Sequence, residues 1–302
     1  MPILKGSAIR IDVFAVFMGV LFALIWSSAF TVGKIALADA PPFLLQSVRF
    51  LVAGLIGVAL AAALGQRMPV EARQWRMIAW LGLCQNTLYL GLMFVALRMI
   101  PAGLAAILAS TMPLMVAAVG ACFLRERSSA GRIIGMVLGF GGAGFIMLDR
   151  LGGGGDPLGI FICMLSVMSL AAATLIARHA NLGTGLFMVV GLQQLFGGLA
   201  LAPFALATES FGEVTVTASL VVCFIYMTLV AGLFATFLWF SLLRRIGTQQ
   251  ASAYHFLNPA FGVAIAWALL GEHLGINDLI GVAVVAIGIL MVQRGGTVRR
   301  PG

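Results

Sequence analysis

Ten long apolar segments with short polar connections constrain this chain more than any other feature. A helix needs about 20 apolar residues to cross the hydrocarbon core of a bilayer, because each residue advances it by about 1.5 Å. Strands would leave backbone groups unpaired in lipid, so helices are expected. The composition agrees, since 62% of the 302 residues are apolar and only 9% are charged. The predicted spans are Val13–Gly33, Phe43–Leu64, Met77–Leu97, Ile100–Leu124, Ile133–Leu148, Pro157–Ala177, Thr184–Thr208, Val214–Leu243, Ile246–Gly271 and Leu279–Gln293.

The basic residues predict how these spans are oriented. Lys and Arg accumulate in the cytoplasmic loops of membrane proteins. If both termini lie inside, fourteen basic residues fall in inside segments, three (Lys34, Arg98 and Arg150) in outside ones, and Arg49 within the second span. Cytoplasmic termini are therefore expected. The net charge of +8 does not indicate nucleic-acid binding, because no amphipathic element gathers the basic residues.

A repeat at a spacing of 146 residues divides the ten spans into two sets of five. Five is an odd number, so the second set must enter the membrane from the opposite side, as in alternating-access carriers. The sequence thus predicts an all-α membrane protein of two inverted five-helix repeats, residues 1–150 and 151–302. The matched pairs are Arg98 with Arg244, Pro113 with Pro259, Glu126 with Glu272, and Gly135 with Gly281.

Several short motifs follow one another in a distinctive order along the chain. They are Trp26-Ser27-Ser28-Ala29-Phe30, Gly33-Lys34, Pro42, Arg49-Phe50, and two proline-to-glutamate segments, 113–126 and 259–272. Together they resemble the motifs of one known family, the EamA type of the drug/metabolite transporter superfamily. The resemblance implies a ten-helix carrier for small molecules, with a cavity among spans 1, 3, 4, 6, 8 and 9 and no cofactor. Many members export amino acids across the bacterial inner membrane, and the chain is similar to the aromatic amino acid exporters among them.

Polar and aromatic side chains near the middle of those six spans are the candidates for substrate binding. Polar groups are costly in hydrocarbon and face the interior of the bundle, and deep aromatic rings can stack on an apolar substrate. For each residue, packing or a bond to a neighbouring helix is the alternative. For Gln193 and Gln194 in span 7, the sequence does not decide between these roles. The candidates are Trp26, Ser27, Gln85, Asn86, Tyr89, Thr111, Tyr226, Trp239, Tyr254, His255 and Asn258.

Two prolines lie deep in equivalent spans. Pro113 and Pro259 cannot donate to the carbonyls of Ala109 and His255, so both helices are expected to kink there. A kink at mid-membrane often marks a binding site, although a tolerated packing kink is the alternative.

Acidic residues are informative by their position, because all of them lie at span ends or in loops. A proton-driven exporter of cations needs a carboxylate within the membrane. The sequence therefore favours a substrate without strong positive charge, such as a neutral zwitterion. Lys34 and Arg49 are expected to reach the outer surface or to pair with Asp39. His255 is expected to be a structural residue, with a proton-transfer role as the alternative.

The predicted function is therefore a carrier that exports neutral or aromatic amino acids, with the bilayer and a small molecule as its partners. A homodimer is compatible with the sequence. The same fold could instead move a purine, a sugar derivative or a cationic compound. A membrane-embedded enzyme is the remote alternative, since no metal-ligand set or nucleophile–base pair is found. Gly139–Gly144 matches a dinucleotide motif, but within a membrane helix it indicates close helix packing.

Overall fold

The computed structural model describes residues 12–100, 102–113, 115–116, 129–148, 156–179, 184–270 and 276–294, and every element in these ranges is a helix. The first set comprises α1 (Val13–Ala36), α2 (Pro42–Ala63), α3 (Ala72–Gly82), η1 (Leu83–Gly91), α4 (Leu92–Met99), α5 (Ala102–Ala109) and α7 (Ala130–Leu148). The second comprises α8 (Pro157–His179), α9 (Leu186–Thr208), η2 (Phe211–Glu213), α10 (Ala218–Ile225), η3 (Tyr226–Phe234), α11 (Ala235–Ile246), α12 (Thr248–Ser252), η4 (Ala253–Leu257), α13 (Asn258–Leu270) and α14 (Ile276–Arg294).

Six helical segments in the described part of the chain are long and apolar enough to cross a membrane. They confirm a multi-pass membrane protein, whereas the ten-span count and the cytoplasmic termini stay predictions. The predicted eighth span begins at Ala218 rather than Val214, because the Thr217 hydroxyl accepts the Leu220 N–H across 3.0 Å and caps the helix. The six segments are Val13–Ala36, Pro42–Ala63, Ala72–Met99, Pro157–Ala177, Leu186–Thr208 and Ala218–Ile246.

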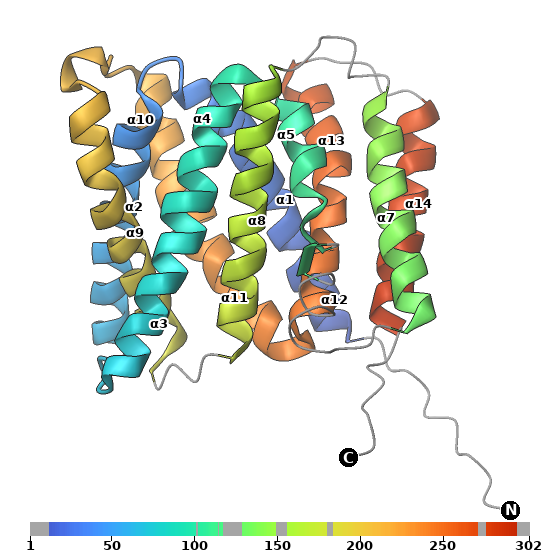
Figure 1. Cartoon of the computed structure of the whole chain (residues 1–302), viewed down its shortest axis with the longest axis horizontal. Helices are drawn as coiled ribbons and strands as arrows, with labels where there is room; N and C mark the ends of the chain where they lie inside the picture. The colour runs from blue at the N-terminus through green and yellow to red at the C-terminus, as the bar shows by residue number, and fades with distance from the viewer. Residues whose placement is uncertain are drawn as a thin grey trace, which may run out of the picture.

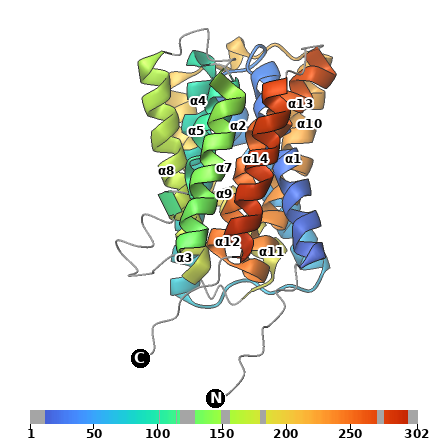
Figure 2. The ribbon, with the colours of Figure 1, turned by 90° about the vertical axis from the view of Figure 1, so that its right-hand side faces the viewer.

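Glycine allows α7 and α14 to pack closely along their length at one end of the bundle (Figures 1 and 2). A Cβ atom on Gly288 would lie 2.5 Å from the backbone nitrogen of Gly139, and one on Gly142 would lie 2.9 Å from that of Val285. The packing interpretation of the glycine motif is thus confirmed for two of its residues, while a Cβ on Gly141 would meet nothing within 4 Å. The two helices run antiparallel, since later residues of α7 meet earlier residues of α14.

The helices α2 and α9 form a second close antiparallel pair at the other end of the long axis (Figure 1). A Cβ on Gly57 would lie 2.8 Å from the Cα of Gly191, and one on Gly198 would lie 3.0 Å from the nitrogen of Leu51. Both pairs join helices that hold equivalent places in the two sets. Antiparallel equivalent helices are what an inverted repeat requires.

Two π-helical segments of nine residues each, η1 and η3, interrupt equivalent helical runs at mid-length. The first lies between α3 and α4, and the second between α10 and α11. A π segment widens the helix locally and is often found at functional sites. Both segments contribute to the pocket described next.

Candidate functional site

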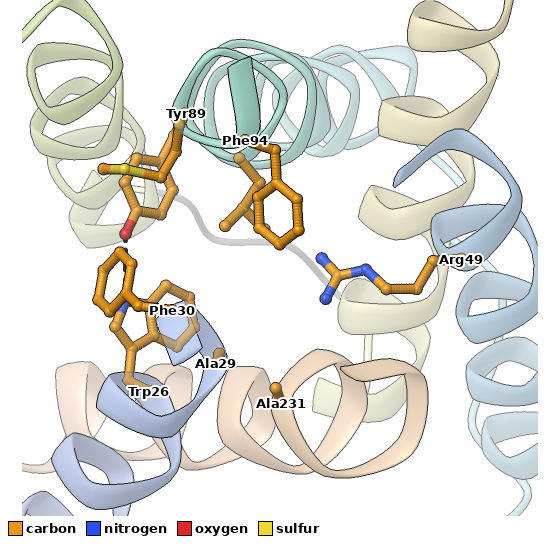
Figure 3. Close-up of a pocket in the computed structure, with 9 residues that line it drawn as sticks. Trp26, Ala29, Phe30, Arg49, Tyr89, Phe94 and Ala231 are labelled. Atoms are coloured by element: carbon orange, nitrogen blue, oxygen red, sulfur yellow. Dashed lines mark hydrogen bonds between the residues drawn. The ribbon is translucent and has the colours of Figure 1, made fainter. Parts of the chain in front are cut away.

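A pocket lies between α1, α2, the η1–α4 run and η3 (Figure 3). Its free volume is about 20 Å³, far below the range of about 300–1,000 Å³ typical of small-molecule sites, so in this conformation it is a narrow cleft that must widen to admit a substrate. Its residues come from the halves of their helices nearest the end where α1 finishes and α2 begins. The lining residues are Trp26, Ala29, Phe30, Arg49, Tyr89, Leu90, Met93, Phe94 and Ala231.

Two of the predicted residues, Trp26 and Tyr89, form one wall of this pocket. The indole Nε1 of Trp26 donates to the Tyr89 hydroxyl across 3.1 Å, and their rings lie 6.1 Å apart with an interplanar angle of 3°. Both side chains are buried. This contact fixes α1 against η1 and presents a flat aromatic surface.

The guanidinium of Arg49 closes the pocket on the side of α2, and Figure 3 shows it pointing into the space between Phe94 and Ala231. The side chain is only 3% exposed. Its Nη1 donates to the carbonyl of Met227 across 3.1 Å, and its Nε has no partner among the described residues. The guanidinium carbon lies 4.6 Å from the Phe50 ring centroid. Arg49 forms no ion pair with any described residue.

This placement corrects the expectation that Arg49 reaches the outer surface or pairs with Asp39. The Asp39 carboxylate instead accepts a hydrogen bond from the Thr217 hydroxyl across 2.6 Å. Lys34 donates to the carbonyl of Ile100 across 3.2 Å, so it too is not paired with Asp39. The position of Arg49 within a span was the available signal, because a charge at such a depth marks a functional site by default.

Predicted residues further along the bundle pack tightly instead of lining the pocket. Trp239 stacks on Phe22 with ring centroids 5.1 Å apart, and the His255 ring meets Trp239 edge-on at 5.1 Å. His255 also meets Trp26 edge-on at 6.2 Å. The Tyr254 ring lies over Gly19, where a Cβ would come within 2.4 Å. This aromatic cluster fills the bundle on the side of Trp26 away from the pocket.

A chain of hydrogen bonds accounts for Ser27, His255 and Asn258. The Ser27 hydroxyl lies 3.2 Å from Oδ1 of Asn258, and Nδ2 of Asn258 lies 3.2 Å from Nδ1 of His255. The Ser110 hydroxyl contacts the backbone carbonyl of His255 across 3.3 Å. All four residues are buried, and together they join α1, the end of α5, and the η4–α13 run.

Helix geometry changes beside both predicted prolines. The helix α5 ends at Ala109, four residues before Pro113, and the 3-10 helix η4 ends at Leu257, two residues before Pro259. These are the places where proline removes a backbone donor. The carbonyl of His255, to which Pro259 cannot donate, accepts a hydrogen bond from the hydroxyl of Ser110, which lies close to Pro113. A role of these breaks in transport stays a prediction.

The amides in and beside η1 join helices. Nδ2 of Asn86 donates to Oε1 of Gln194 across 2.7 Å, so Gln194 joins α9 to η1. Gln193 is fully buried, and its side-chain amide has no hydrogen-bond partner within the described ranges. Gln85 is buried but does not line the pocket.

The remaining two candidates, Tyr226 and Thr111, are only partly buried. The Tyr226 hydroxyl contacts that of Ser28, which links η3 to α1. The Thr111 hydroxyl donates to the carbonyl of Leu108 across 2.7 Å, a bond within its own chain segment. Neither side chain lines the pocket of Figure 3.

Metal binding finds no support in the described residues, which contain no group of three or more His, Cys, Asp and Glu side chains able to hold an ion. Cys84, Cys163 and Cys223 are buried and unlinked, and Cys122 lies outside the described residues. Glu126 and Glu272 of the repeat also lie outside them.

Comparison with known proteins gives a consistent result. The model of the EamA-like transporter family matches residues 13–148 and again residues 157–294. An uncharacterized inner membrane transporter of Escherichia coli, YedA, is 28% identical over 92% of this chain and 90% of its own. Protein PecM of Dickeya dadantii is 26% identical over 89% of both chains, and the uncharacterized transporter YvbV of Bacillus subtilis is 24% identical over 89% and 88%.

A solved crystal structure shares the fold. It superposes with a TM-score of 0.76 and covers 92% of this chain and 96% of its own. At 18% sequence identity, this likeness concerns the fold alone.

Proposed function

The chain belongs to the EamA-like transporter family, and from this premise we propose that it is a secondary carrier exporting neutral or aromatic amino acids. The family and the names of its relatives indicate a membrane transporter rather than an enzyme. The observation that carries the finer proposal is the lining of the pocket of Figure 3, which includes the aromatic rings of Trp26, Phe30 and Phe94.

The lining of the pocket favours such a substrate over the alternatives. Its walls are aromatic and aliphatic, which suits the side chain of a phenylalanine or a leucine. No carboxylate is among the lining residues, so a cationic compound would find no partner of opposite charge. Few hydrogen-bonding groups line it, which disfavours a sugar derivative.

Alternating access is supported by the contrast between the two sides of Trp26. One side is the pocket, and the other is filled by the stacked rings of Phe22 and Trp239 with His255. A carrier must expose its site to one face of the membrane at a time. By the predicted orientation this conformation faces outward, and rocking of the two halves would open the opposite side.

The location proposed for the carrier is the inner membrane of a bacterium. YedA, a relative of similar length, is named as an inner membrane transporter. The excess of basic residues in the predicted inside loops fits the same placement.

Reconstitution into liposomes tests the proposal. Purified protein should stimulate uptake of radiolabelled phenylalanine and leucine relative to protein-free liposomes, and liposomes preloaded with unlabelled amino acid should accelerate it by exchange. Ala29→Leu should abolish the stimulation by filling the pocket, whereas Ala59→Leu, on an exposed face of α2, should not. Stimulation by no neutral or aromatic amino acid would refute the proposed substrate class.

A further inference from the structure

We infer that Arg49 recognises the carboxylate of the transported molecule, so that the substrate is an apolar or aromatic body bearing a carboxylate. The inference rests on the proposed function and specifies its substrate. The guanidinium would hold the carboxylate at one side of the pocket, and the body would lie against the rings of Trp26, Phe30 and Phe94.

The burial of an unpaired charge is the first argument. An isolated ion is strongly disfavoured in a low-dielectric interior unless an opposite charge or several hydrogen bonds compensate it. Arg49 is 3% exposed, and no carboxylate of the described residues pairs with it. Such a residue is retained within a membrane helix where it serves a ligand.

The free hydrogen-bonding capacity of Arg49 is the second argument. A guanidinium has five N–H donors in a planar fork that matches a carboxylate. In the described structure only Met227 supplies an acceptor for it, and the Nε has none. Figure 3 shows the end of the fork directed into the pocket rather than into a helix. A bound carboxylate would supply the missing acceptors.

The contacts that hold the Arg49 guanidinium in place are the third argument. The carbonyl of Met227 belongs to the π segment η3, and the Arg49 side chain lies over the Phe50 ring at 4.6 Å. The Phe94 ring centroid lies 5.9 Å from the guanidinium carbon on the pocket side. These contacts hold the group in one place, and pre-organisation of this kind favours binding of a rigid anion.

The amino group of an amino acid has no equivalent partner. No acidic side chain is among the lining residues, so an ammonium ion would meet aromatic faces and no opposite charge. The carboxylate is therefore the group that is recognised, whether it belongs to an α-amino acid or to the corresponding acid without an amino group.

Three probes of one size separate these possibilities in the wild-type protein. Radiolabelled phenylalanine, 3-phenylpropionate and 2-phenylethylamine would be offered to proteoliposomes. Uptake of phenylalanine or 3-phenylpropionate is expected, and uptake of 2-phenylethylamine is not. The ratio of the first two shows which source of the carboxylate the pocket prefers. Equal transport of 2-phenylethylamine and phenylalanine would overturn the inference while leaving the carrier function intact, whereas transport of none would refute the proposed function itself.

Variants of Arg49 test its role in binding the carboxylate. Arg49→Gln should raise the half-saturating concentration of the carboxylate substrate by about 10- to 100-fold, the usual loss for a hydrogen bond to a charged group, and Arg49→Lys should restore part of it. Arg98→Gln, which removes an exposed arginine at the end of α4, is the matched control and should transport as the wild type does. An unchanged half-saturating concentration in Arg49→Gln would overturn the inference.

A second pair of variants keeps Arg49 in place and does not depend on the folding of Arg49→Gln. Ala231→Asp puts a carboxylate on the pocket wall beside the guanidinium, and it should block carboxylate substrates by occupying their site. Ala231→Asn has nearly the same size without the charge and should retain more transport. Equal transport by both variants would contradict the proposed role of Arg49.

Discussion

Trp26 of α1 donates its indole hydrogen to the hydroxyl of Tyr89 in the π segment η1, and the two rings lie nearly parallel 6.1 Å apart. The bond joins two distant parts of the chain at the wall of the pocket. It holds the two rings nearly parallel to each other. Its contribution can be isolated, because each partner has a conservative substitute.

A double-mutant cycle on this pair should show coupling. Trp26→Phe and Tyr89→Phe each remove one side of the hydrogen bond, and each should lower the free energy of unfolding by about 1 kcal/mol, with the double variant losing less than the sum. Thermal unfolding in detergent measures all four proteins. Strict additivity of the two losses would show that the bond does not contribute.

Loss of the Asn258 amide should reduce stability more than substrate affinity. Its side chain bonds to Ser27 and His255 and does not line the pocket. Asn258→Ala removes the partner of the buried Nδ1 of His255, which costs about 1–3 kcal/mol, while the Ser27 hydroxyl keeps its bond to the carbonyl of Ala23. A lower unfolding temperature with an unchanged half-saturating substrate concentration is expected. Thr111→Val, which removes only a local bond, should be nearly neutral.

The helix pair α7–α14 should be sensitive to a single methyl group at Gly288. A Cβ there would lie 2.5 Å from the backbone nitrogen of Gly139, so the helices must separate, and Gly288→Ala is expected to cost about 1–3 kcal/mol. Gly141→Ala is the matched control, since nothing lies within 4 Å of its Cβ position. Equal unfolding temperatures for the two variants would contradict the close packing.

The ion pair at the start of α1 should make the stability of the protein depend on pH in the acid range. Hydrogen bonds from Arg245 hold the pKa of Asp12 below its usual value of 3.8. A lowered native pKa means that the pair adds stability above the unfolded-state pKa and loses it as the pH falls through the native value. The unfolding temperature of the wild type should therefore drop below about pH 4, in the range of an ordinary aspartate pKa.

Asp12→Asn isolates this ion pair, because asparagine still caps the helix as Asp12 does toward the N–H of Ala15. The variant should lack the acid-dependent loss. The difference from the wild type at neutral pH should be small and should shrink in high salt, since the pair is exposed. A difference that persists at low pH would exclude the ion pair as its cause.

Hydropathy predicted the spans well wherever a helix crosses the bundle uninterrupted. The predicted Pro157–Ala177 lies within α8, and the predicted Phe43–Leu64 differs from α2 by one residue at each end. Bilayer thickness sets such lengths, so composition alone defines them. The π segments could not be predicted, because no residue type distinguishes Leu83–Gly91 from regular helix.

Two of the residues predicted from their depth in the spans, Trp26 and Tyr89, line the pocket, and their role in substrate binding stays a prediction. The polar character of Asn258 and His255 correctly predicted that they lie in the interior of the bundle. It could not show that their side chains contact each other. The prediction that Arg49 reaches the outer surface or pairs with Asp39 was wrong, because a sequence shows the depth of a residue and not the direction in which its side chain points.

The two π segments also link the shape of the pocket to backbone register. A π turn holds one residue more than an α-helical turn over the same contour, and one residue corresponds to about 100° of rotation about the helix axis. If η1 became regular helix, then Tyr89 and the Met93 and Phe94 side chains after it would swing around the axis together. The orientation of the aromatic wall therefore depends on which hydrogen-bond partners the backbone of η1 takes, and regular helix there would turn the wall away from the pocket.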